Sequence, residues 1–170
     1  MAVSGSTNFE PDITEFIEEA YERCGLELRT GYDLKSAIRS ANFMLAEWAN
    51  RGLNQWTITT GTQTVTKGTN SYDLGTDVID VLDVVVRRTV NGTTTDIRLD
   101  KLSRSEFFSI PNKATEARPS QYFIDKQNNP KIFVYPTPEN STDVIRFNKL
   151  SRLDDADDAK NTMDIPFRFY

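Results

Sequence analysis

The sequence predicts an α+β protein: an N-terminal antiparallel helical hairpin, part of a helical bundle, followed by an antiparallel β-rich domain with one short helix. Apolar residues recur at helical spacing from residue 12 to about residue 52. From residue 56 the chain becomes Thr-rich and alternating, with turn residues between short runs. At 170 residues it is long enough to bury a core. We therefore expect a flexible N-terminal tail at 1–11, a helical hairpin at 12–54, an antiparallel β domain at 55–152, and an acidic loop with the start of a C-terminal helix at 153–170.

The first helix is predicted between Asp12, which can cap it, and Gly25, which ends it. Cys24, the only cysteine, is expected to be a small buried hydrophobe near the helix end. One face is apolar, with Ile13, Phe16, Ile17, Ala20, Tyr21 and Cys24. The opposite face carries Glu15, Glu18, Glu19, Glu22 and Arg23. That charged face is either solvated or one wall of an interface.

The second helix is predicted to begin near Asp33 and to end at Gly52. Its apolar positions alternate in steps of four and three, at Leu34, Ile38, Ala41, Leu45 and Trp48. Such a narrow stripe packs against another helix. The short connection at residues 25–31 predicts an antiparallel hairpin. Two helices alone make a poor core, so this layer is expected to need further partners.

The first half of the β domain contains one strong turn signal. Asn91-Gly92 predicts a type I′ hairpin turn, because both central residues of that turn need positive φ. The flanking residues 84–90 and 94–99 should therefore pair antiparallel. Upstream, the sequence predicts strands with a turn around Gly61, a short strand at 71–74, and a turn before residue 84.

The second half begins with a capping box, Ser103-Arg-Ser-Glu106, which predicts a short helix stopped by Pro111. A loop at 112–119 should follow. Strands are then predicted at 120–125, 131–135 and 143–150. The acidic loop after them contains Asp154, Asp155, Asp157 and Asp158.

The composition argues against an enzyme. The chain has no histidine, the usual base for Ser and Cys nucleophiles and the commonest metal ligand. Phosphate-loop and G-x-S-x-G motifs are absent, and the aspartate cluster lacks the spacing of a calcium loop. We therefore predict no catalytic residue, no cofactor and no metal site. The net charge of −5 also disfavours strong duplex binding, and no apolar run would span a membrane.

Several segments are informative in combination, although none is a chemical signature alone. They are AYERCGLELRTGYDL (20–34), LAEWANRGLNQWT (45–57), DVIDVLDVVVR (77–87), SRSEFFSIPNK (103–113), RPSQYFID (118–125) and DIPFRF (164–169). In this order they resemble the head-to-tail connector, or adaptor, proteins of tailed bacteriophages, similar to tail tubular protein A of short-tailed phages. The resemblance covers nearly the whole chain from about Phe9.

The resemblance implies a structural virion protein at the portal–tail junction, made in the host cytoplasm. It implies a subunit of a dodecameric adaptor ring between the portal and the tail tube or nozzle, with phage DNA passing through the ring without specific binding. Members usually continue past the DIPFRF segment into further helices. The residues themselves also allow an alternative, a carbohydrate- or receptor-binding β module of a phage tail, with Trp56, Tyr72, Tyr122 or Tyr135 stacking on sugar rings.

The best candidate for a partner interface is the aromatic terminal segment Ile165, Pro166, Phe167, Arg168, Phe169 and Tyr170. It reads as an opening helix with the composition of contact surfaces. Arg87, Arg88 and Arg118 can also meet a partner's carboxylates, or they can serve surface solubility.

Overall fold

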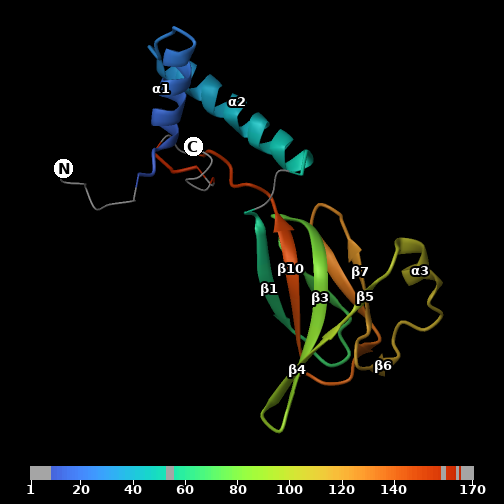
Figure 1. The fold of residues 1–170 in the computed structure, drawn as a ribbon. Coiled ribbons are helices and arrows are strands. Elements are labelled where there is room, and N and C mark those ends of the chain that lie inside the picture. The colour runs from blue at the N-terminus through green and yellow to red at the C-terminus, as the bar shows by residue number, and fades with distance from the viewer. Residues whose placement is uncertain (1–8, 53–55, 158–159, 164, 166–170) are drawn as a thin grey trace. The chain divides into compact units, whose positions relative to one another are not determined.

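The computed structural model describes residues 9–52, 56–157, 160–163 and 165. The chain divides into two compact units. The helical unit combines Met1–Trp56 with Leu153–Tyr170, and the β unit is Thr57–Arg152. The β unit is thus inserted between two pieces of the helical unit in the sequence. Helices and antiparallel sheets in one chain confirm the predicted α+β class (Figure 1).

Helix α1 (Ile13–Arg23) begins with a capping box. The amide N–H of Glu15 donates to Oδ1 of Asp12 at 2.9 Å, and the amide of Asp12 donates to Oε2 of Glu15 at 3.0 Å. Ile13 and Ile17 are buried. The expectation that Cys24 is buried was wrong, because its side chain is exposed. Cys24 is the C-cap residue, where the chain leaves the helix and helical periodicity no longer sets the direction of a side chain.

Helix α2 (Gly31–Asn50) starts two residues before the predicted position, with Thr30 as its N-cap. Figure 1 shows it running back from the top of α1 at a slant. Leu45 is buried, and the other members of its apolar stripe are half-buried. The C-terminal piece of the unit returns to both helices. The amide of Ile13 donates to the carbonyl of Asn161 at 3.0 Å, and the amide of Ala156 donates to Oδ1 of Asn42 at 2.7 Å.

The β unit contains two four-stranded sheets. The first is antiparallel in the order β1 (Ile58–Thr64), β10 (Val144–Ser151), β3 (Val78–Val90) and β4 (Thr93–Arg98). The second has the order β2 (Ser71–Asp73), β8 (Lys131–Tyr135), β7 (Gln121–Asp125) and β5 (Asp100–Lys101), with β5 parallel to β7. The short strands β6 (Glu116–Ala117) and β9 (Thr137–Pro138) form a separate parallel pair.

One hydrophobic cluster joins the two sheets into a β sandwich. Val84, Val86 and Ile145 of the first sheet and Ile132 and Val134 of the second are almost fully buried in it. The alternation of inward β-branched residues along these strands is what the period of a strand requires. The short helix α3 (Arg104–Ser109) has the predicted capping box, with the Glu106 amide donating to Ser103 Oγ at 3.3 Å.

The hairpin prediction was confirmed, and two turn predictions were wrong. Asn91 and Gly92 have φ of 50° and 79°, and they join β3 to β4. Gly61, in contrast, lies inside β1 rather than in a turn, and its missing side chain makes room for the ring of Phe147 on β10. Residues 78–83 also belong to the long strand β3, whose pairing with β10 continues past a bulge. Within the predicted loop at 112–119 lies β6.

Candidate functional site

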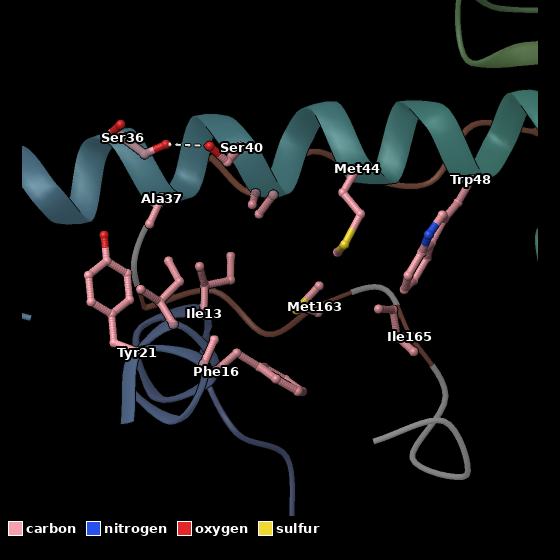
Figure 2. A pocket seen from close by; sticks show the side chains of 14 residues that line it. Ile13, Phe16, Tyr21, Ser36, Ala37, Ser40, Met44, Trp48, Met163 and Ile165 are labelled. Carbon is pink, nitrogen blue, oxygen red and sulfur yellow. Dashed lines mark hydrogen bonds between the residues drawn. The ribbon is translucent and has the colours of Figure 1, made fainter. Parts of the chain in front are cut away.

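The helical unit contains an apolar groove of about 520 Å³ between α1, α2 and the returning C-terminal segment (Figure 2). Phe16 points into it from α1, Met44 and Trp48 point into it from α2, and Met163 and Ile165 close it from the third side (Figure 2). Most of its lining is hydrocarbon or aromatic, and Ser36 and Ser40 add hydroxyl groups from α2. Apolar surface left in contact with water is unfavourable, so the groove is a candidate contact site.

The walls of the groove are fixed by burial and by hydrogen bonds. Ile13 and Ile17 anchor α1 in a small core with Ala156. Ala156 in turn exchanges two hydrogen bonds with the side chain of Asn42, at 2.7 and 3.4 Å. On α2, Met44 remains 38% exposed at the groove, and the neighbouring Phe43 is 70% exposed.

The predicted interface segment meets this groove at its first residue. Ile165 is half-buried and lines the groove beside Met163. The rest of the segment, Pro166, Phe167, Arg168, Phe169 and Tyr170, lies outside the described residues, as does most of the predicted C-terminal helix start.

A second, more polar hollow follows the glutamate face of α1. It is lined by Glu15, Glu18, Glu19 and Glu22 together with Phe9 and Phe16. Phe16 borders both hollows. The acidic face of α1 therefore lies directly beside the apolar groove.

Charge is distributed unevenly between the units. The sequence of the β unit contains 13 Lys and Arg and 11 Asp and Glu, a net charge of +2. The rest of the chain contains 7 basic and 14 acidic residues, a net charge of −7. The acidity of the whole protein thus comes from the helical unit.

The two adjacent arginines of β3 bind carboxylates of their own unit. Arg88 donates from Nη2 to Oδ2 of Asp143 at 2.7 Å and to Glu139 at 3.2 Å. Burial by itself would raise the pKa of Asp143, but hydrogen bonds from Arg88 and Asn140 hold that pKa below its usual value. The hydrogen bonds that Arg88 makes to Asp143 and Glu139 raise the pKa of its guanidinium.

Arg87 forms two hydrogen bonds of 2.7 Å with Asp96 on β4. These bonds lower the pKa of the Asp96 carboxyl and raise that of Arg87. The side chains of Arg87 and Arg88 are therefore engaged within the chain. Arg118 is exposed.

Two of the four aromatic residues considered for sugar stacking serve packing. Tyr72 and Tyr122 belong to the hydrophobic cluster, and burial raises the pKa of both hydroxyls. Trp56 and Tyr135 are half-buried.

Sequence reasoning missed an aromatic group around α3. Phe107 stacks on Phe123 with ring centroids 5.1 Å apart, and Lys113 lies over both Phe107 and Phe108. Phe108 is 65% exposed. Its position in a helix of six residues gave no periodic signal that would have separated the buried from the exposed phenylalanine.

The described part of the chain holds neither a metal-binding group of side chains nor a membrane-spanning helix. Groups of three or more His, Cys, Asp or Glu side chains suited to a metal ion do not occur there. In the same part, no helix is both long and apolar enough to cross a membrane.

Comparison with known proteins gives one clear result. A search of curated proteins found no match. A family model, described as SU10 adaptor protein, matches residues 12–169 and so covers sequence from both units. The match includes the stripe of α2, the β sandwich and the segment that lines the groove. On this evidence the chain belongs to the SU10 adaptor protein family, a family of phage adaptor proteins.

Proposed function

We propose that the chain is a structural virion protein, one subunit of the adaptor ring that joins the portal to the tail tube or nozzle. The observation that carries the proposal is the match of residues 12–169 to the SU10 adaptor protein family. The resemblance to tail tubular protein A-like adaptors supports the finer parts: twelve copies in the ring, a place at the portal–tail junction, and a channel for DNA during ejection.

Two features of the helical unit fit a subunit that contacts neighbours. Its groove is apolar, and α2 exposes Phe43 and Met44 beside it. We place part of the partner contact in the segment Ile165, Pro166, Phe167, Arg168, Phe169 and Tyr170, because Phe, Arg and Tyr are enriched where proteins meet.

The acidic balance fits a channel protein. The helical unit carries a net charge of −7, and like charges repel the DNA backbone rather than retain it. If its carboxylates face the channel, replacing Glu18, Glu19 and Glu22 with Gln should slow DNA ejection and leave assembly intact. Unchanged ejection kinetics would remove this part of the proposal.

Electron microscopy of purified particles tests the location directly. A tagged copy of the chain should add density between the portal and the tail, and mixing the protein with portal should yield one large defined oligomer. Persistent monomer in that mixture would contradict the ring.

The terminal segment is tested by Phe169→Asp, with Phe108→Asp as a matched control on a described, exposed phenylalanine. The first variant should reduce incorporation into particles and the second should not.

A carbohydrate- or receptor-binding role has weaker support, because two of its four aromatic candidates are buried in the sandwich core.

A further inference from the structure

The first sheet of the β unit ends at two edge strands, β1 and β4, and neither pairs with a further strand among the described residues. Edge strands present rows of N–H and C=O groups that can pair with another chain, and proteins usually block them with charge, proline or a covering segment. β1 reads Ile-Thr-Thr-Gly-Thr-Gln-Thr and contains neither a charged residue nor a proline. Its residues are mostly exposed.

The hydrogen-bond register shows which backbone groups face outward on β1. The amide of Ser151 donates to the carbonyl of Thr57, and the amide of Val65 donates to the carbonyl of Asp143. In an antiparallel pair the bonded positions alternate, so the odd-numbered residues between 57 and 65 bond to β10. Ile58, Thr60, Thr62 and Thr64 therefore direct their N–H and C=O groups outward. The carbonyl of Thr64 accepts from the side chain of its own neighbour Gln63.

The same reasoning applies to β4. The two-residue turn closes at Val90 and Thr93, and the amide of Leu99 donates to the carbonyl of Val84. Thr94, Asp96 and Arg98 therefore direct their backbone groups outward.

The charged side chains of β4 are already compensated within the unit. Asp96 is paired with Arg87, and Arg98 with Asp83 at 3.1 Å. The edge of β4 thus offers a neighbouring strand backbone groups and threonines without an uncompensated charge.

Strand direction decides which partner fits both edges. The sheet has four strands and every neighbouring pair is antiparallel, so β1 and β4 run in opposite directions. A second copy turned about an axis along the strands brings its β1 beside β4 with the two strands antiparallel. The alternation then continues from copy to copy, and this head-to-tail contact closes into a ring when the rotation closes.

We propose that β1 of one copy pairs with β4 of the next, and that this pairing is an interface between the subunits of the assembled protein. The partner is a second copy of this chain, recognised through its backbone by strand addition. The inference rests on the proposed ring and specifies one contact within it. Along the sheet, Thr64 lies in the same row as Val144, Arg87 and Asp96, which places Thr64 near residues 94–96 of the neighbour.

Cysteine cross-linking tests the pairing in purified particles and in portal-bound oligomers. The background is Cys24→Ser, since Cys24 is the single cysteine and is exposed. Thr64→Cys with Thr94→Cys, treated with a short bismaleimide, should give a series of cross-linked oligomers on denaturing gels. Each single variant should stay monomeric. The control pair, Thr64→Cys with Ser105→Cys on α3, should also stay monomeric.

Three outcomes are decisive. Dimers from Thr64→Cys alone would mean that β1 pairs with β1, and would overturn the proposal. Particles that contain the double variant but give no cross-linked series would overturn the edge pairing and leave the adaptor function standing. Absence of the unmodified chain from particles would contradict both the edge pairing and the adaptor function.

A second variant tests the backbone itself. Thr62→Pro removes an outward N–H and leaves the bonds of β1 to β10 in place, and edge strands tolerate such prolines. Its unfolding transition should match that of the parent protein, whereas the cross-linked yield should fall about tenfold or more because a bond of the short interface is lost. An unchanged yield would contradict the pairing.

Discussion

Among the glycines of the β unit, Gly61 leaves the least room for a side chain. A Cβ on Gly61 would lie 2.5 Å from Cε2 and 2.7 Å from Cζ of Phe147, well inside contact distance. Gly61 and Phe147 are directly opposed in the antiparallel pair of β1 and β10. Glycine at this position therefore lets the ring lie across the strand.

Gly61→Ala should accordingly destabilise the β unit. The added methyl group forces the Phe147 ring or the strand to move, which costs about 1–3 kcal/mol of the free energy of unfolding. Urea denaturation followed by circular dichroism measures the loss. Gly31→Ala is the matched control, because nothing lies within 4 Å of its Cβ position. A second change, Phe147→Leu, should recover part of the stability in the Gly61→Ala background. A Gly61→Ala variant as stable as the parent would contradict this account.

Asp143 couples stability to pH. It is 2% exposed and accepts hydrogen bonds from Arg88 and Asn140, which hold its pKa below the usual value. An aspartate with a depressed folded-state pKa stabilises the protein above its unfolded pKa of about 3.9, and this stabilisation is lost as pH falls through the lower folded pKa. We therefore expect the free energy of unfolding to fall in acid, below about pH 4.

Asp143→Asn should reduce stability at pH 7 by about 1–3 kcal/mol, because Arg88 loses its buried partner but keeps Glu139. In acid, the free energy of unfolding of the variant should also decline less steeply than that of the parent. Denaturation measured from about pH 2 to about pH 7 checks this difference. Asp73→Asn, which alters an exposed pair with Lys131, should stay within about 0.5 kcal/mol of the parent. Equal acid slopes for Asp143→Asn and the parent would count against the assignment.

At the scale of elements, local chemistry could be predicted and long-range pairing could not. Asn91-Gly92 and the Ser103–Glu106 capping box each determine their own backbone within a few residues, and both were confirmed. Gly61 was misread because the residue that explains it, Phe147, is 86 positions away along β10. The pairing of β1 with β10 likewise depends on the whole sandwich. A short-range sequence pattern does not determine which residues of two distant strands lie opposite each other.

The candidate groove could likewise be predicted only where it depends on local sequence patterns. The helical stripes predicted which faces of α1 and α2 are apolar. The third wall comes from Ala156, Met163 and Ile165. Ala156 is tied to α2 by its hydrogen bonds with Asn42, 114 residues earlier. A stretch dominated by aspartates gave no sign of this contact, although its Leu153 and Ala156 are buried.

Asn42→Ala should therefore loosen the returning segment. The buried amide of Ala156 loses its acceptor, at a cost of about 1–3 kcal/mol. Hydrogen exchange at Ala156 should become faster, while exchange in β3 and β10 should stay unchanged. Ser40→Ala is the control, because Ser40 bonds only one turn back along α2, to the carbonyl of Ser36. Unchanged exchange at Ala156 would mean that packing of Leu153 and Ala156 holds the segment without the side chain of Asn42.

At the scale of the whole molecule, the β unit behaves as an insertion with its own core and its own charge. Its hydrophobic cluster draws only on residues between Val65 and Phe147. Its first and last residues are close, since the amide of Ser151 donates to the carbonyl of Thr57 at 3.1 Å. Adjacent ends are what allow a domain to be inserted into another one.

The excised segment 57–152 should consequently fold alone. We expect one cooperative unfolding transition and a β-type circular dichroism spectrum, because both sheets and the cluster between them lie inside this segment. With a net charge of +2 it should migrate as a cation at pH 7, whereas the whole chain, with −5, migrates as an anion. The circular permutation control, with new ends at the Asn91-Gly92 turn and the old ends joined, should fold with the same spectrum, because that turn is exposed at the tip of its hairpin. A segment that stays unfolded while the whole chain folds would show that the sandwich needs the helical unit. The two units would then be compact regions of one chain that are not stable independently of each other.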